Sequence, residues 1–274
     1  MTINKIIIEL ADKLKGKENA RLEIKMLIKD ILNINDVELI LKYNEEMNND
    51  LYEKLISSFN RLKSGEPVQY IINQKEFMGM KFYVDKNVLI PRADTEVLVE
   101  RVLENEKEGV NILDMCSGSG CIGISIKNYN EKHKVVCADY SKEAIKIGQR
   151  NAKANEVDVK FVESDLFTNI EEKFDAIVSN PPYIKYEEYV ELDDIVLKNE
   201  PKLALYADDN GLYFYKKISK EAKQYLNEGG RLYFEIGYNQ AEEVKNIMQN
   251  NSFYNIIVEK DLKGKDRVIY GTLK

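Results

Sequence analysis

The first quarter of the chain has apolar residues spaced three or four apart. Leu51, Leu55, Phe59 and Leu62 show this most clearly, because they fall on one face of a helix. The same spacing predicts four short helices, over residues 3–15, 18–32, 35–47 and 50–64. No strand pattern precedes residue 68, so we expect residues 1–65 to form a small helical bundle that recognises a partner or supports the rest.

The pattern then changes from helical spacing to short β-rich runs. Residues 68–72 and 80–84 are rich in β-branched and aromatic side chains, and Gly79 lies between them. We interpret residues 66–90 as a β-hairpin linker. Pro91 and the acidic residues after it suit the start of a helix that continues to about residue 107.

From residue 110, buried apolar runs alternate with amphipathic segments. The runs predict seven strands, at residues 110–115, 134–138, 159–163, 174–178, 231–236, 253–259 and 267–272. The segments between them predict helices at residues 121–130, 141–155, 211–227 and 239–250. Such alternation is typical of a doubly wound α/β fold, with a mostly parallel sheet and helices on both faces. The last two strands are expected to form a terminal antiparallel hairpin of the domain at residues 91–274.

Composition narrows the class of protein. No apolar run approaches the ~18 residues that a membrane span requires, and the N-terminus lacks a signal-peptide layout, so we expect a cytoplasmic protein without a membrane partner. The chain has three cysteines and one histidine, His133, which lies in a polar turn and is expected to be solvated. These counts argue against zinc clusters and histidine-based triads. The net charge of −7 and the lack of a basic stripe argue against direct nucleic-acid binding.

A turn of small residues follows the strand at 110–115 and precedes a helix. The turn comprises Cys116, Ser117, Gly118, Ser119 and Gly120. It lets a ligand approach the backbone and the free N–H groups of a helix N-terminus. Asp139, at the end of the next strand, can accept hydrogen bonds from the ribose hydroxyls of an adenosine.

The same segment also matches a dinucleotide-binding fingerprint. Gly118, Gly120 and Gly123 have the G-x-G-x-x-G spacing, and Asp139 follows at the expected distance. A nicotinamide-dependent dehydrogenase is therefore a rival interpretation. Against it, the turn follows Asp114 at the strand end, and no obvious proton-transfer group is present for hydride chemistry.

The stretch Asn180, Pro181, Pro182 and Tyr183 ends the apolar strand at 174–178. Two prolines fix φ and remove two N–H groups, so Asn180 should be held rigidly at the strand tip. Its amide and the neighbouring carbonyls can bind one planar NH2 group, and the Tyr183 ring can pack on that group. A simple Pro-Pro turn is the alternative.

Two further positions are candidates by their place in the chain. Asp165 and Leu166 follow the third strand and should flank an adenine ring, although a capping Asp before a turn fits equally well. Arg92 should line the substrate entrance, or else pair on the surface with Asp94 or Glu96.

Blocks over most of the chain resemble the glutamine N5-methyltransferases that modify the Gly-Gly-Gln loop of class I peptide chain release factors. The blocks run in family order: Gly65–Ile71, Glu76-Phe77, Leu89–Glu96, the glycine turn, Ala138-Asp139, Ser164–Phe167, Ser179–Ile184, Glu200–Leu205, Glu235–Gly237 and Asp266-Arg267. The N-terminal bundle matches only in kind and position. Cys116 stands where the family usually has glycine, and its Cβ is tolerable if φ there is negative; Leu166 stands where some relatives carry an aromatic residue.

The resemblance implies a class I S-adenosylmethionine-dependent methyltransferase that acts, as a monomer, on class I release factors. It implies cofactor contacts from the glycine turn, Asp139, Asp165, Leu166 and Asn180. Asn180 and Tyr183 would be catalytic, and the Pro181 carbonyl and the side chains of Pro182 and Arg92 would help bind the substrate amide. Similar families methylate a ribosomal-protein glutamine or the exocyclic amine of adenine, and an inactive binding module is a further alternative.

Overall fold

In the computed structural model of the chain, residues 1–14 and 16–274 are described, and they form two compact units, residues 1–74 and 75–274. The first unit is helical. Its helices are α1 (Ile3–Asp12), α2 (Ala20–Leu32), α3 (Asp36–Leu41), α4 (Asn49–Lys63) and α5 (Val68–Ile71). Leu27, Leu55 and Phe59 lie in their common core, as the apolar spacing predicts. Residue 15, the last of the predicted first helix, lies outside the described residues.

The prediction of a strand at residues 68–72 is wrong. This segment is the short helix α5, and the N–H groups of Tyr70 and Ile71 both donate to the Pro67 carbonyl oxygen. Val68 and Ile71 are buried in the core of the helical unit, so tertiary packing overrides the β preference of their side chains. The actual hairpin is shorter, pairs β1 (Lys75–Phe77) with β2 (Met80–Phe82), and belongs to the second unit.

A seven-stranded sheet forms the centre of the second unit. Its strands are β3 (Asn111–Met115), β4 (Lys134–Asp139), β5 (Lys160–Glu163), β6 (Phe174–Ser179), β7 (Leu226–Glu235), β8 (Phe253–Lys260) and β9 (Asp266–Leu273). The order is β5-β4-β3-β6-β7-β9-β8, and β9 runs antiparallel to both of its neighbours. The predicted doubly wound sheet with a terminal antiparallel hairpin is therefore confirmed. The strand order reverses between β3 and β6, which is where such folds bind ligands.

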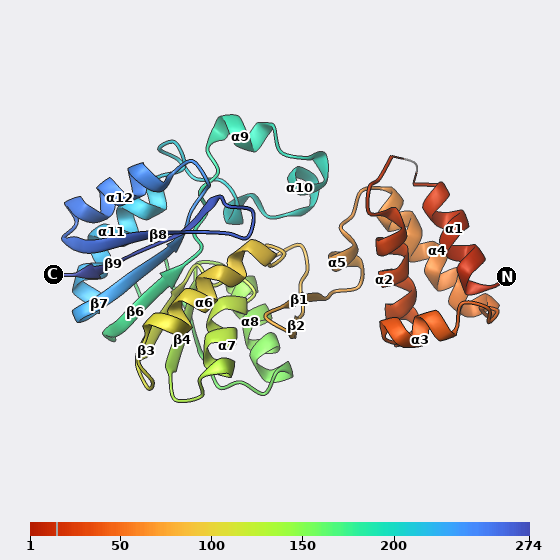
Figure 1. Ribbon diagram of the computed structural model, residues 1–274, viewed down its shortest axis with the longest axis horizontal. Helices are drawn as coiled ribbons and strands as arrows, with labels where there is room; N and C mark the ends of the chain where they lie inside the picture. Colours follow the sequence, from red (N-terminus) through yellow and green to blue (C-terminus); the bar gives the residue numbers. More distant parts are fainter. Residues whose placement is uncertain (15) are drawn as a thin grey trace. The chain divides into compact units, whose positions relative to one another are not determined.

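Helices cover both faces of this sheet (Figure 1). On one face lie α6 (Glu96–Asn105), α7 (Cys121–Tyr129) and α8 (Lys142–Ala154), and on the other α11 (Tyr213–Tyr225) and α12 (Ala241–Asn250). The short elements η1 (Ala93–Thr95), α9 (Tyr186–Val190), α10 (Asp194–Asn199) and η2 (Lys202–Ala204) lie near the carboxyl ends of the strands. None of the described helices is long and apolar enough to cross a membrane.

The expectation for His133 is also wrong. Its side chain is buried rather than solvated, because the chain turns back sharply before β4. The His133 N–H donates to the Asn130 carbonyl oxygen at 3.1 Å, and Lys127 Nζ donates to the His133 carbonyl oxygen at 2.7 Å. Burial lowers the pKa of the imidazole, which favours a neutral ring.

Candidate active site

The turn between β3 and α7 brings backbone N–H groups to the switch point of the sheet. Gly118 has φ +55°, and a Cβ built there would meet no atom within 4 Å. Gly123, in the first turn of α7, permits a close approach to the sheet instead, because a Cβ there would lie 2.4 Å from the Cys137 sulfur. Its N–H donates to Asp114 Oδ2 at 2.9 Å. Burial raises the pKa of Asp114 to about 7, and Asp114 Oδ1 has no hydrogen-bond partner among the described residues.

Cys116 adopts a conformation that normally favours glycine. Its φ is +61°, so the condition of a negative φ, on which its tolerance depended, is not met. A side chain in the left-handed region costs roughly 1–2 kcal/mol. Burial raises the pKa of the Cys116 thiol well above its ordinary value. The side chain is therefore a neutral thiol and not a reactive thiolate.

Asp139 is held rigidly at the end of β4. Its Oδ2 accepts from the Gly118 N–H, and its Oδ1 accepts from the Ser141 N–H, both at 2.8 Å. Burial raises the pKa of the carboxyl, and these two hydrogen bonds act in the opposite direction. Each carboxylate oxygen retains a lone pair for a second donor. The role of Asp139 as a ribose acceptor stays a prediction, but its geometry suits that role.

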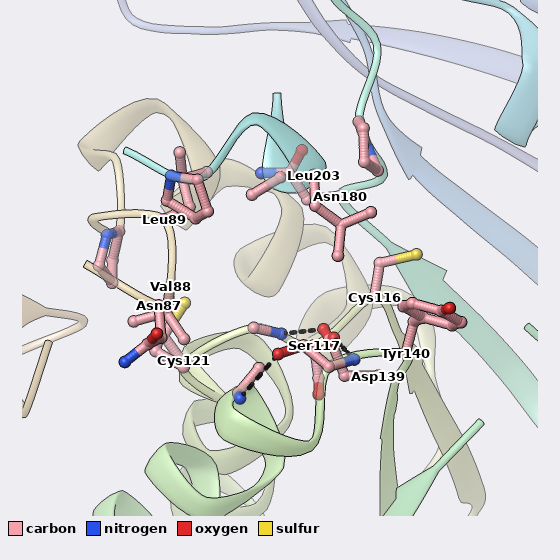
Figure 2. A pocket seen from close by; sticks show the side chains of 18 of the residues that line it. Asn87, Val88, Leu89, Cys116, Ser117, Cys121, Asp139, Tyr140, Asn180 and Leu203 are labelled. Atoms are coloured by element: carbon pink, nitrogen blue, oxygen red, sulfur yellow. Dashed lines mark hydrogen bonds between the residues drawn. The ribbon is translucent and has the colours of Figure 1, made fainter. Parts of the chain in front are cut away.

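A cavity of about 270 Å³, here called the main cavity, lies between these groups and Asn180. Figure 2 shows Asn87, Val88 and Leu89 on one side of it and Cys116, Asp139 and Tyr140 on the other. Its wall also includes Arg92, Thr95, Ser117, Gly118, Ser119, Cys121, Pro182, Leu203 and Phe214. Ser117 Oγ is buried in this wall and has no hydrogen-bond partner among the described residues, so a ligand could supply one.

Asn180 lies at the tip of β6, where the sequence predicts it. Its Nδ2 donates to Thr95 Oγ1 at 3.4 Å. Over residues 1–14 and 16–274, no protein group donates to Asn180 Oδ1 or to the Pro181 carbonyl oxygen. Both acceptors are therefore available to another NH2 group. The Pro181 side chain is buried, and Pro182 lines the main cavity.

A second cavity of about 150 Å³ shares Asn180 with the first. Its wall consists of Leu89, Arg92, Asn180, Tyr183, Ile184, Leu192, Val196, Ala204, Leu205 and Glu235. Tyr183 lines this second cavity rather than the main one, and its hydroxyl donates to Glu235 Oε1 at 3.4 Å. Burial raises the pKa of the Tyr183 hydroxyl, so Tyr183 stays neutral. Asn180 thus lines two cavities of different volume.

Arg92 lines both cavities, but its partner differs from the two that the sequence suggested. Its Nη2 donates to Glu200 Oε1 at 2.6 Å, and the Glu200 side chain is almost fully buried. Asp94 lies instead 3.8 Å from Arg267 Nη2, and Glu96 accepts from the Met78 N–H at 2.8 Å. The ion pair joins the segment before η1 to the one before η2.

Three predicted cofactor residues do not line either cavity. Asp165 is exposed, and Leu166 is buried in the core at φ +48°. The reason is local: Ser164 Oγ donates to the Leu166 carbonyl oxygen at 2.6 Å and turns the loop, so Leu166 points into the sheet packing. Gly120 shapes the turn through its N–H, which donates to the Ser117 carbonyl oxygen at 2.8 Å. The adenine contacts expected of Asp165 and Leu166 therefore stay a prediction.

Sequence reasoning missed Asn151, a buried residue of α8. Its Nδ2 donates to the carbonyl oxygens of Ser119 and Tyr83, at 2.9 and 3.0 Å, and its Oδ1 accepts from the Tyr83 N–H at 2.6 Å. It therefore ties the glycine turn to the segment after β2. The available signal was a polar residue on the apolar face of the predicted helix, in line with Ala144 and Ile147.

Known protein families match most of this chain in sequence. A family model described as the PrmC N-terminal domain matches residues 5–72, and one described as the methyltransferase small domain matches residues 92–199. The release factor glutamine methyltransferase of Lactococcus lactis is 39% identical over 249 residues, which is 90% of this chain and 92% of that protein. The chain belongs to the release factor glutamine methyltransferase family.

Other relatives agree with this family. The release factor glutamine methyltransferase of Fusobacterium nucleatum is 42% identical, with 94% of this chain and 74% of that protein covered. A methyltransferase structure from Pyrococcus furiosus has a TM-score of 0.56 at 16% identity, over 78% of this chain and 96% of that one, which supports the fold alone. Membership of the family sets the dehydrogenase interpretation aside.

Proposed function

We propose that this chain transfers a methyl group from S-adenosylmethionine to the side-chain amide nitrogen of the glutamine in the Gly-Gly-Gln loop of class I peptide chain release factors. The observation that carries the proposal is the position of Asn180, which lines both cavities with a side-chain oxygen free to accept. The release factor activity that names the relatives supports this substrate over a ribosomal-protein glutamine or an adenine amine.

The residues around the main cavity fit the cofactor. S-adenosylmethionine, when bound, supplies an electrophilic methyl group on a sulfonium sulfur. Asp139 would accept hydrogen bonds from the ribose hydroxyls. Gly118 has no side chain, so a ligand could approach its backbone closely. The unpartnered Ser117 hydroxyl would gain a partner, and Cys116 and Ser119 would complete the wall.

Asn180 and the Pro181 carbonyl would orient the substrate amide. An amide nitrogen is a poor nucleophile, since its lone pair is delocalised into the carbonyl group. Two fixed acceptors hold both N–H groups, turn the lone pair toward the main cavity, and gain strength as positive charge develops on nitrogen. Tyr183 would pack against the amide from the second cavity, which suits a neutral aromatic ring. No strong base is needed before transfer, because the proton can leave afterwards.

The experiment is single-turnover methyl transfer to a protein substrate with a Gly-Gly-Gln loop, with cofactor affinity measured in parallel. Asn180→Ala removes one acceptor and should lower the rate by about 10²–10³ with little change in affinity. Asn180→Asp keeps the shape but adds a charge that favours the sulfonium in the ground state, so the rate should fall while the cofactor binds more tightly. A near wild-type rate for Asn180→Ala would refute the amide-orienting role.

We further propose that the helical unit docks the release factor while residues 75–274 carry out the transfer, with the protein acting as a cytoplasmic monomer. The unit has its own apolar core and matches the PrmC N-terminal domain. Deleting residues 1–74 should raise KM for an intact protein substrate much more than KM for a short Gly-Gly-Gln peptide. Equal losses on both substrates would mean that the unit only supports the fold.

A further inference from the structure

Gln240, the residue that precedes helix α12, ties the segment after β7 to the stretch that carries Tyr183. Its Nε2 donates to the Tyr183 carbonyl oxygen at 3.1 Å. Its Oε1 accepts from the Gly237 N–H at 3.0 Å, and this contact fixes which way round the amide lies, because an N–H group cannot face the NH2 end. Gln240 lies outside the walls of both cavities, so the proposed mechanism gives it no contact with substrate or cofactor.

Gly211 packs against the same hydrogen bond from another segment. A Cβ built at this position would lie 2.2 Å from the Tyr183 carbonyl oxygen and 2.9 Å from Gln240 Nε2. Glycine therefore allows an approach that any side chain would prevent unless one of these two groups moved. Gly211 has φ +81°, and Asp209 and Asn210 before it have φ +57° and +55°. The loop before α11 thus adopts an unfavourable backbone conformation at the point where it meets Tyr183.

The peptide group between Tyr183 and Ile184 is held on its other side as well. The Ile184 N–H donates to the Leu205 carbonyl oxygen at 2.9 Å, and the Ile184 carbonyl oxygen accepts from the Ala207 N–H at 3.0 Å. Both polar atoms of the peptide group therefore have a partner from a distant part of the chain, one from Gln240 and one from Leu205. This peptide group is a fixed point after the two prolines.

The sheet provides a second fixed point before the prolines. Ser179, the last residue of β6, pairs with both neighbouring strands, β3 and β7. Between the two fixed points lie residues 180–183, and two of these four are prolines with restricted φ. So short and stiff a connection leaves the Pro181 carbonyl little freedom while both ends hold. Loosening the Tyr183 end would let the Pro181 carbonyl and the Tyr183 ring turn away from the substrate amide.

We infer that Gln240 is a positioning residue that, through its hydrogen bond to the Tyr183 carbonyl oxygen, holds the Pro181 carbonyl and the Tyr183 ring in the orientation that the substrate amide requires. Gly211 permits the close packing that keeps this hydrogen bond in place. The inference rests on the proposed function. Neither Gln240 nor Gly211 touches the reacting atoms.

Gln240→Glu tests the hydrogen bond with little change of shape. The carboxylate still accepts from the Gly237 N–H, but it has no N–H to offer to the Tyr183 carbonyl oxygen. The single-turnover rate should fall by roughly 10- to 100-fold, as for other small misplacements of a reacting group. Affinity for S-adenosylmethionine should stay close to wild type, because neither Gln240 nor Tyr183 lines the main cavity.

Asn239→Asp is the matched control. It makes the same change from amide to carboxylate one residue earlier, so both variants add one negative charge near the start of α12. The Asn239 side chain is exposed and donates to Glu188 Oε1 at 3.5 Å. Its rate and affinity should both stay near wild type. A wild-type rate for Gln240→Glu, an equal loss of rate in both variants, or a loss of affinity that matches the loss of rate would overturn the inference.

A second pair of variants tests the packing of Gly211. Gly211→Ala places a Cβ against Tyr183 and Gln240, whereas Gly264→Ala places one at a similar φ, +76°, with no described atom within 4 Å. Both should lower the melting temperature through the strained φ, by roughly 2–8 °C for Gly264→Ala. Gly211→Ala alone should also lower the rate, to about the level of Gln240→Glu, and the double variant should be no slower than the slower single one. A wild-type rate for Gly211→Ala would contradict the packing role; if this variant does not fold, Gln240→Glu decides.

A further readout does not depend on turnover. The Ile184 amide nitrogen belongs to the same peptide group as the Tyr183 carbonyl, so its ¹H–¹⁵N signal responds when that carbonyl loses a hydrogen bond. The signal should move in Gln240→Glu and Gly211→Ala and stay in place in the two control variants. An unmoved signal in Gln240→Glu overturns the inference. If the wild-type protein fails to methylate a Gly-Gly-Gln peptide, the proposed function fails, while this spectrum still decides whether Gln240 holds the Tyr183 carbonyl.

Discussion

Replacing Cys116 should show how much strain the glycine turn stores. Alanine at this position removes the sulfur but keeps the Cβ at φ +61°. Glycine also removes the Cβ and relieves a strain of about 1–2 kcal/mol. Glycine also increases the conformational entropy of the unfolded chain, which destabilises the folded state by about 0.5–1 kcal/mol. Cys116→Gly should therefore be more stable than Cys116→Ala by up to about 1.5 kcal/mol.

Ser117 provides the control, because it lies in the same cavity wall but has no positive φ. There the step from alanine to glycine should destabilise by about 0.5–1 kcal/mol. The difference between the two steps cancels the entropy of glycine and leaves the strain at Cys116 alone, about 1–2 kcal/mol.

Thermal unfolding of the four variants measures this difference. A free-energy change of 1 kcal/mol shifts the melting temperature by roughly 2–4 °C in a unit of about 200 residues. The two alanine-to-glycine steps should therefore differ by roughly 2–8 °C. Cys116→Gly should also bind S-adenosylmethionine more tightly, because a side chain is removed from the wall. Equal steps at both positions would refute the claim that the turn is strained.

Three further predictions concern buried polar groups. Asp139→Ala should weaken S-adenosylmethionine binding by roughly 1.5–3 kcal/mol in calorimetric titration, and unchanged affinity would remove its ribose role. Folding raises the pKa of Asp114 from 3.8 to about 7, so the folded state binds this proton more tightly than the unfolded state does. The resulting contribution to the free energy of unfolding is complete below pH 3.8 and is lost as the pH rises to about 7. The gain from Asp114→Asn should thus grow over this range by up to about 4 kcal/mol, and a pH-independent difference in urea unfolding would contradict it. Asn151→Leu should destabilise by about 3 kcal/mol or more in the same assay, since Tyr83 and Ser119 lose their partners; a loss below 1 kcal/mol would contradict this.

The sequence by itself determined the order of elements and the place of the site. Alternating strands and helices impose a parallel sheet, since parallel strands need a crossover connection. The strand ends then bring the glycine turn, Asp139 and Asn180 to one edge, although they lie far apart in the chain. Two consecutive prolines after a strand restrict the backbone locally, so the rigid placement of Asn180 required no tertiary information.

Tertiary structure decided which side chains face one another. Residues 68–71 have strand propensity but form a helix, because Val68 and Ile71 complete an apolar core contributed by other helices. Arg92 pairs with Glu200, 108 residues away, and not with its acidic neighbours. Glu235 accepts a hydrogen bond from the Tyr183 hydroxyl, 52 residues away in the chain, because β6 and β7 pair in the sheet. Periodicity reports local conformation and the buried face of an element, whereas such partnerships depend on how distant elements pack, which no local pattern contains.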